Sequence, residues 1–282
     1  MSRDATLNEG AIRAQFQELA DLLDEAVDVY LIGGGALTLQ ELKNATKDID
    51  LIVETAAELE RLRESLVAAD YSFPEDIREE YEDLEAAFIL EKGARRFDVF
   101  HRQVAGELML TDTMKERSQH LLDAGPLTVR MVSLNDIFLF KSVANRADDV
   151  DDMVTLAQAG IDETVIMAEA KRQIGDIAQD AFVRSMKQKL DRLADAGYAF
   201  GIHDEVDALY AKLEAAERVE QRLWSLYDTE YRDDLYAGVP RDRLEQELAA
   251  ELDVAAALEW LQRVERVEVA DDESLVPIGR EA

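Results

Sequence analysis

The sequence predicts an α+β protein, in which a small mixed sheet carries helices and is followed by a helical region that ends in a winged-helix-like module. Three observations support this class. Short apolar runs alternate with segments of helical spacing over roughly the first hundred residues, in the order strand, helix, strand, helix, strand, strand. From about Leu134 to Leu226 the pattern is almost entirely helical. Residues 240–279 then read as two short helices and a hairpin.

Hydrophobic periodicity defines the elements in order. Apolar positions at helical spacing predict a helix over 8–26, and the apolar run 27–33, which ends in glycine, predicts a buried strand. Aspartates alternate with apolar residues over 48–54, which predicts a strand with Asp48 and Asp50 on one face. The other expected elements are helices over 36–42, 56–70, 241–251 and 254–265, neighbouring strands over 85–92 and 95–101, and a hairpin over 267–278.

The changes of pattern divide the chain into three parts. Residues 1–158 form the mixed-sheet domain, residues 159–236 the helical region, and residues 237–282 the winged-helix-like module. The second helix of that module offers only Arg263, with Arg266 just beyond it, for contact with nucleic acid. A role in packing against a protein partner or a second copy is therefore expected rather than DNA binding.

The composition is strongly acidic. There are 62 Asp and Glu against 31 Lys and Arg, a net charge of −31, and only nine of the basic residues are lysine. Few lysines among many acidic residues are typical of proteins from salt-loving organisms, whose surfaces stay soluble at molar salt. Because the Debye length is only about 3 Å at 1 M salt, this charge does not exclude a polyanionic partner.

Several classes of protein are excluded by what the chain lacks. It has no cysteine, so disulfides, thiolate metal sites and cysteine nucleophiles are ruled out. No apolar run approaches the roughly 20 residues of a membrane span, and the first residues lack the apolar stretch of a secretory signal. His101, His120 and His203 show no metal-ligand spacing. A soluble cytoplasmic protein is expected.

A glycine pair marks the first candidate site. The strand that ends in Gly33 and Gly34 turns directly into a helix, whose first backbone N–H groups have no partner within the helix. Such a turn is suited to binding phosphate. A plain tight turn also explains the two glycines.

Three aspartates on strands form the second candidate site. Asp48 and Asp50 leave the same strand face about 6–7 Å apart at Cα. Like charges this close are unfavourable unless a cation lies between them, and magnesium prefers carboxylate and phosphate oxygens. Asp98 lies between Phe97 and Val99 in a later strand, which could place it beside the pair. The alternatives are a metal site for phosphoryl or nucleotidyl transfer and a solvated acidic face.

These residues resemble a known signature. Gly33-Gly34, thirteen intervening residues and Asp48-Ile49-Asp50-Leu51 look like the motif of the DNA polymerase β-type nucleotidyltransferase superfamily. Residues 139–156 are similar to a segment of its stand-alone branch, which includes abortive-infection-type toxins. The matching residues of that segment are Lys141, Arg146, Asp149 and Asp152. The resemblance covers about residues 25–158.

Two positions depart from the family pattern. Gly35 and Ala36 follow the glycine pair, where the family often has a serine or threonine whose hydroxyl contacts phosphate. Asn44, with Lys43 beside it, stands where an arginine commonly precedes the aspartates. Neither departure removes a carboxylate.

The resemblance implies roles for the site residues. Asp48, Asp50 and Asp98 would be the catalytic carboxylates and would hold Mg²⁺ or Mn²⁺ on a nucleoside triphosphate. Gly33 and Gly34 would contact phosphate through their backbone. Lys141 and Arg146 would neutralise charge on the phosphates, or would instead pair with the acidic residues that follow them; both interpretations stay open at this point. Asp149 and Asp152 are expected to be pairing partners on the helix surface rather than metal ligands.

The resemblance also suggests an acceptor. In the abortive-infection branch the acceptor would be a tRNA end or a protein side chain, in a toxin–antitoxin or phage-defence system. The alternative from another class is a non-catalytic, nucleotide-sensing regulatory or antitoxin-like protein, which would bind DNA or a protein partner through its C-terminal module.

Overall fold

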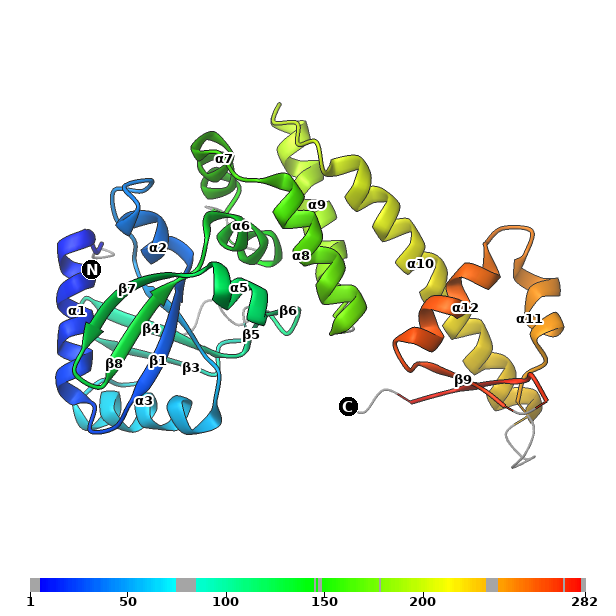
Figure 1. Cartoon of the computed structure of the whole chain (residues 1–282), viewed down its shortest axis with the longest axis horizontal. Coiled ribbons are helices and arrows are strands. Elements are labelled where there is room, and N and C mark those ends of the chain that lie inside the picture. The colour runs from blue at the N-terminus through cyan, green and yellow to red at the C-terminus, as the bar shows by residue number, and fades with distance from the viewer. Residues whose placement is uncertain are drawn as a thin grey trace.

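The fold joins a mixed-sheet part to a helical part (Figure 1). The computed structural model describes residues 6–74, 85–144, 146, 149–177, 179–231, 238–270 and 272–279. The predicted α+β class is confirmed, because a six-stranded mixed sheet with helices is followed by a run of helices. Among the described residues, no helix is both long enough and apolar enough to cross a membrane.

The sheet has the strand order β3-β4-β2-β1-β8-β7. Its central strand pairs are β2 with β4 and β1 with β8, both parallel, while β1 runs antiparallel to β2. The outer pairs, β3 with β4 and β7 with β8, are antiparallel hairpins. The strands are β1 Val27–Ile32, β2 Ile49–Val53, β3 Phe88–Lys92, β4 Arg95–His101, β7 Gln119–Ala124 and β8 Leu127–Met131.

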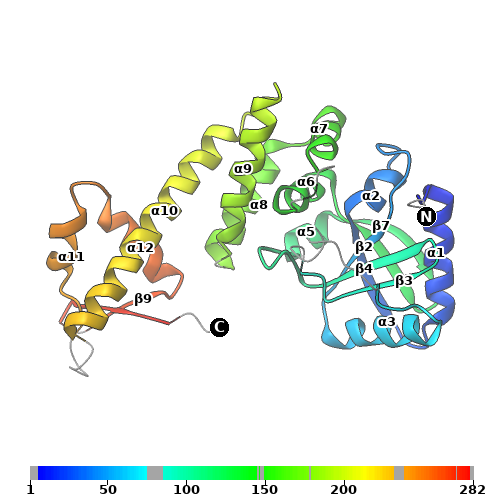
Figure 2. The ribbon, with the colours of Figure 1, turned by 180° about the vertical axis from the view of Figure 1, so that it is seen from behind.

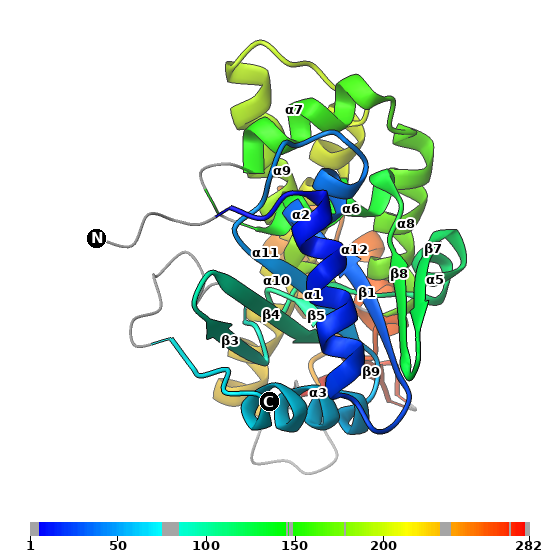
Figure 3. The same cartoon turned by 90° about the vertical axis from the view of Figure 1, so that its left-hand side faces the viewer.

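The two faces of the sheet have different coverings. Helices α1 (Glu9–Leu22) and α3 (Ala56–Ala68) pack on one face (Figure 3). There the Tyr71 ring, just beyond α3, lies 5.9 Å from the ring of Phe97. The opposite face carries Asp50 and Asp98, since side chains alternate along a strand. That face is covered by α6 (Leu134–Val143) and by the small β5–β6 hairpin (Gln103–Val104 and Leu108–Met109).

Helix α2 begins earlier than the apolar pattern indicates. It spans Gly33–Leu39, so the glycines form its first turn rather than the end of the preceding strand. No helix or strand was predicted for the segment between β4 and α6. It contains α5 (Asp112–Arg117) and the β7–β8 hairpin, whose second strand is the parallel neighbour of β1.

Helices and a terminal hairpin are observed in the predicted helical region and terminal module. Their members are α7 Asp149–Ala159, α8 Glu163–Asp176, α9 Ala181–Asp195, α10 His203–Leu226 with a π-helical end at Tyr227–Tyr231, α11 Arg241–Leu248, α12 Val254–Arg263, β9 Val267–Val269 and β10 Leu275–Pro277. The last two helices and the β9–β10 hairpin stand at the far end of α10 from the sheet (Figure 2).

Buried apolar residues form two clusters. The first extends from Leu7 to Leu213 and contains the sheet together with α6 to α9. The second extends from Ala216 to Leu275 and contains the end of α10 and the terminal module. The predicted boundary at 236/237 lies outside the described residues, and the one at 158/159 falls in the last turn of α7. Both boundaries remain predictions.

Candidate functional site

Two parallel strands bring the three predicted carboxylates together. The Cα of Asp50 in β2 is paired with that of Asp98 in β4, and Asp48 directly precedes β2. All three side chains are buried, and each offers a carboxylate oxygen within 4.8 Å of the other two. The sheet register therefore produces the cluster that the spacing of the motifs predicts.

Burial and mutual repulsion make this cluster costly to ionise. Burial, together with the nearby charge of Asp48, raises the pKa of Asp50 to about 8. Burial also raises the pKa of Asp98 to about 6, although an arginine bound to it acts in the opposite direction. The Oδ2 atom of Asp50 is buried and has no hydrogen-bond partner among the described residues. A buried acceptor without a hydrogen-bond partner is suited to bind a cation.

The glycines are required by close approach to the carboxylates. Gly33 has a φ of +65°, and a Cβ atom there would overlap Oδ2 of Asp50. A Cβ atom on Gly34 would lie 2.5 Å from Oγ1 of Thr46, whose hydroxyl donates to Asp48 at 3.4 Å. The start of α2 thus lies against Asp50 with no side chain between them.

Arg146 faces the carboxylates as the motif match implies. Its guanidinium lies 3.9 Å from oxygens of Asp48 and of Asp50. The same residue is held by Asp149, which accepts a hydrogen bond from its backbone N–H at 2.8 Å and lies 3.6 Å from its Nε. Arg146 therefore both pairs with Asp149, the first residue of α7, and reaches the cluster.

Lys141 forms ion pairs with the acidic residues that follow it, which is the second of its two predicted roles. Its ammonium group lies 2.7 Å from Asp149 and 2.8 Å from Asp152, and its side chain is buried. Lys43 also binds Asp152, at 2.9 Å. Asp149 and Asp152 are pairing partners as expected, but they are buried and not on the helix surface as predicted. The ion pairs connect the α2–β2 loop, α6 and α7 behind Arg146.

Arg96 is a member of the site that sequence reasoning missed. Its guanidinium binds both oxygens of Asp98, at 2.7 Å and 3.0 Å. The two residues are two positions apart on β4, so they share a strand face, and this spacing is the signal that could have identified the pair. Asp98 is fully buried, and its charge is matched by Arg96 in this structure.

Two larger cavities lie on the same side of the sheet as the carboxylates. The first, which we call the α9 pocket, has a volume of about 340 Å³. It is lined by Glu85, Ala105, Glu107, Ser142, Val143, Ala144, Ser185, Gln188, Lys189 and Arg192. It shares Ala144 with a small space bounded by Gly33, Asp50 and Arg146. The α9 pocket is therefore a neighbour of the small space beside Asp50.

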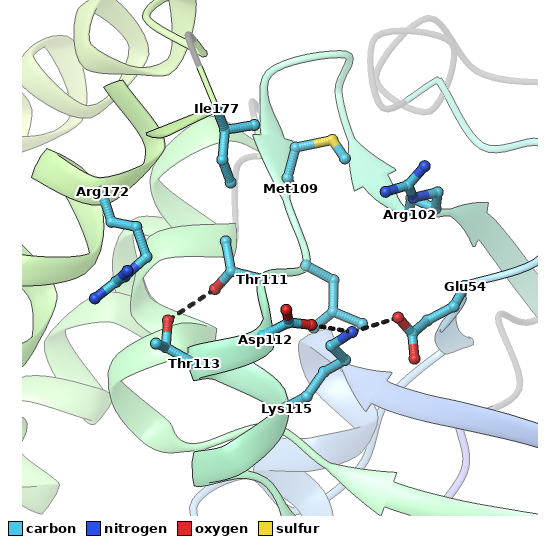
Figure 4. Close-up of a pocket in the computed structure, with 10 residues that line it drawn as sticks. Glu54, Arg102, Met109, Thr111, Asp112, Thr113, Lys115, Arg172 and Ile177 are labelled. Atoms are coloured by element: carbon cyan, nitrogen blue, oxygen red, sulfur yellow. Dashed lines mark hydrogen bonds and ion pairs between the residues drawn. The ribbon is translucent and has the colours of Figure 1, made fainter. Parts of the chain in front are cut away.

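The second cavity, the α5 pocket, has a volume of about 330 Å³ (Figure 4). It is lined by Glu54, Arg102, Met109, Leu110, Thr111, Asp112, Thr113, Lys115, Arg172 and Ile177. Glu54 and Arg102 follow β2 and β4 directly, so this pocket lies toward the carboxyl ends of the strands. Lys115 is engaged by both Glu54 and Asp112, as Figure 4 shows.

One family model matches the chain. It is described as a nucleotidyltransferase of unknown function (DUF6036), and it matches residues 11–191, from α1 to α9. The match covers well over half of the chain and contains the three carboxylates, the glycine pair, Arg146 and the lining of the α9 pocket except for Arg192. No protein of curated function matches the chain.

Proposed function

Because the chain belongs to the DUF6036 family of nucleotidyltransferases, we propose that it transfers a nucleoside monophosphate by the metal-dependent mechanism of the DNA polymerase β-type superfamily. Membership of this family makes the chain an enzyme that uses a nucleoside triphosphate, and it argues against the non-catalytic alternative. The observation that carries the proposed mechanism is the cluster of Asp48, Asp50 and Asp98 beside the Gly33–Gly34 turn.

The cluster fits a divalent metal ion. It consists of carboxylates alone, which are the ligands that Mg²⁺ and Mn²⁺ prefer. Oδ2 of Asp50 is a buried acceptor without a partner among the described residues, and Gly33 leaves the space beside it free of side chain. Asp48 and Asp50, with Asp98, would hold the ion. When bound, it would supply positive charge that lets the triphosphate approach the carboxylates.

The proposed reaction is a nucleophilic substitution at phosphorus. An oxygen of the acceptor forms a bond to the α-phosphorus, the bond to the α,β-bridging oxygen breaks, and pyrophosphate leaves. We assign the acceptor's proton to Asp98, the third carboxylate of the cluster. Arg146, fixed by Asp149, would stabilise the negative charge of the phosphates. Lys141 positions Asp149 and thereby Arg146.

The acceptor and the biological role are part of the proposal. The similarity of Lys141, Arg146, Asp149 and Asp152 to the abortive-infection branch supports a tRNA end or a protein side chain as acceptor. It also supports a place in a toxin–antitoxin or phage-defence system, with a protein partner.

Replacement of the carboxylates tests the mechanism. Asp48→Asn and Asp50→Asn should each reduce transfer of label from an α-labelled triphosphate to background, while the melting temperature stays unchanged or rises because a crowded like charge is removed. Calorimetry should detect triphosphate binding with Mg²⁺ or Mn²⁺ and not with EDTA. Asp151→Asn, at an exposed position on α7, is the matched control and should keep parental activity. Triphosphate affinity that is equal with metal and with EDTA contradicts the role given to the metal.

A further inference from the structure

The α9 pocket is a neighbour of the small space beside Asp50, and its lining includes Glu107, whose Oε2 has no hydrogen-bond partner among the described residues. Val104 lines the small space next to Asp50, and the following residue, Ala105, lines the α9 pocket. Ala144 lines both. These shared and adjacent residues place the α9 pocket next to the space beside the cluster. The volume of about 340 Å³ falls within the range of small-molecule sites.

Most polar groups of the pocket are already engaged. Lys189 donates to the carbonyl oxygen of Ala144 at 2.7 Å, and Ser142 donates to the carbonyl oxygen of Leu139 at 2.7 Å. Ser185, on α9, donates to Oε1 of Glu107 at 3.2 Å. These bonds fix the walls of the pocket, and Gln188 and Arg192 are the other side-chain donors in its lining.

Glu107 is the exception. It lies in the turn of the β5–β6 hairpin, and its Oε2 is buried with no hydrogen-bond partner among the described residues. A buried acceptor without a donor destabilises the protein unless a donor arrives with a ligand. Glu85 lines the same pocket and adds a second carboxylate. This wall therefore favours a ligand that presents N–H donors.

We propose that the α9 pocket binds the nucleobase of the triphosphate and that Glu107 accepts a hydrogen bond from an exocyclic amino group. Adenine, cytosine and guanine each carry such a group. Uracil offers a single N–H flanked by two carbonyl oxygens, which would face the carboxylate unfavourably. The enzyme should therefore bind ATP, GTP or CTP more tightly than UTP. This inference rests on the proposed function, because it assigns the base of the same substrate.

The test compares the four nucleotides as α,β-methylene analogues, which bind without transfer, using calorimetry with Mg²⁺ and the full chain. In the parent protein the best amino-bearing analogue should bind at least about tenfold more tightly than the UTP analogue, since a site built to receive a donor rejects a base that lacks it. Glu107→Gln, whose amide can donate, should bring this ratio close to one. Glu54→Gln, in the α5 pocket, removes the same charge and should preserve the parental ratio.

The ratio separates this inference from the proposed function. Failure of every analogue to bind in the presence of metal would overturn the proposed function and this assignment together. Binding of all four with equal affinity, or an unchanged ratio in a folded Glu107→Gln variant, would overturn the base assignment alone. If Glu107→Gln does not fold, Ser185→Ala removes the donor that fixes Glu107 and should still lower the ratio; a parental ratio there would count against the proposal.

Discussion

Asp50 combines the conditions that a metal-binding carboxylate needs and that a structural carboxylate avoids. Its Oδ1 lies 3.9 Å from Arg146, and its Oδ2 is buried without a partner among the described residues. A purely structural buried carboxylate is ordinarily satisfied by hydrogen bonds. In the absence of a cation the least costly state of Asp50 is the protonated one, which is why its pKa is raised to about 8.

This raised pKa predicts how stability and metal binding depend on pH. The folded pKa values of Asp50 and Asp98, about 8 and about 6, lie above the unfolded value of roughly 3.9. Between pH 4 and pH 8 the folded state therefore holds protons that the unfolded state has released. Their contribution to the stability of the metal-free protein is complete below pH 4 and is lost as the pH rises through 6 and then 8.

Metal affinity should follow the opposite trend, because a metal ion displaces the same protons. We expect the affinity for Mn²⁺ to rise from pH 6 to pH 8.5 and binding at pH 7 to release on the order of one proton. Calorimetry in two buffers of different ionisation enthalpy measures the number released. Asp50→Asn should release fewer protons, and affinity that does not vary with pH would show that these carboxylates are not the ligands.

Arg96 predicts a second effect on the metal. Because it binds both oxygens of Asp98, an incoming ion must compete with it. Arg96→Gln should raise the Mn²⁺ affinity about tenfold, since it removes both a competitor and a nearby positive charge. It should also destabilise the metal-free protein, by about 3 kcal/mol, because Asp98 is left buried without its partner.

The control for Arg96 is the neighbouring residue on β4. Arg95 pairs with Glu18 of α1 at 2.5 Å, on the opposite face of the sheet. Arg95→Gln changes the charge equally and should leave the metal affinity at the parental value. Equal Mn²⁺ affinities for the two variants would mean that Arg96 does not compete for Asp98.

At the scale of elements, several helices converge on the segment that carries Arg146. Helix α6 supplies Lys141, α7 supplies Asp149, and α9 supplies Lys189, whose ammonium group donates to the carbonyl oxygen of Ala144. Burial lowers the pKa of Lys189, which shows that its charge is costly where it lies. A costly buried amine that holds the backbone two residues before Arg146 is better suited to positioning than to stability.

Replacement of Lys189 separates these two roles. Lys189→Met keeps the length of the side chain and removes the hydrogen bond to Ala144. We expect kcat to fall by about tenfold, because Arg146 is held less firmly, while the melting temperature stays the same or rises. Lys187→Met, on the same helix, breaks only pairs with Asp191 and Asp207 and should keep parental kcat. A drop in stability with unchanged kcat would reassign Lys189 to packing.

Sequence patterns predicted the strands that carry the site residues, but they did not predict which other side chains those residues contact. The apolar runs predicted β1, β2 and β4, and the Asp-Ile-Asp spacing predicted which face would carry the carboxylates. The β7–β8 hairpin was missed because its strands are half exposed, and β8 pairs with β1 across about a hundred residues of chain. Likewise, only the folded chain reveals that Lys43 binds Asp152 and that Lys189 reaches Ala144.

At the scale of the whole molecule, α10 passes from one hydrophobic cluster to the other. Leu213 is the last buried residue of the first cluster, and Ala216 is the first of the second. Trp260 of α12 packs against both clusters. The carboxylates and both pockets belong to the part of the chain that builds the first cluster. The second cluster carries no residue of the candidate site, so its role is expected to lie outside the chemical step.

A fragment of residues 1–215 tests this division. It retains α8 and α9, whose Ile166, Phe182 and Leu190 are buried in the first cluster, and it ends between the two clusters. We propose that the terminal module helps to recognise the acceptor. The fragment should then fold and bind a triphosphate with Mg²⁺ at parental affinity, but lose transfer to the acceptor. Circular dichroism, calorimetry and the labelling assay measure the three properties. A fragment of residues 1–160, which lacks those buried side chains and Lys189, is the control and should fail to fold. Labelling of the acceptor by the folded 1–215 fragment at the parental rate would exclude acceptor recognition by the terminal module and would leave assembly with a second copy or a protein partner as its role.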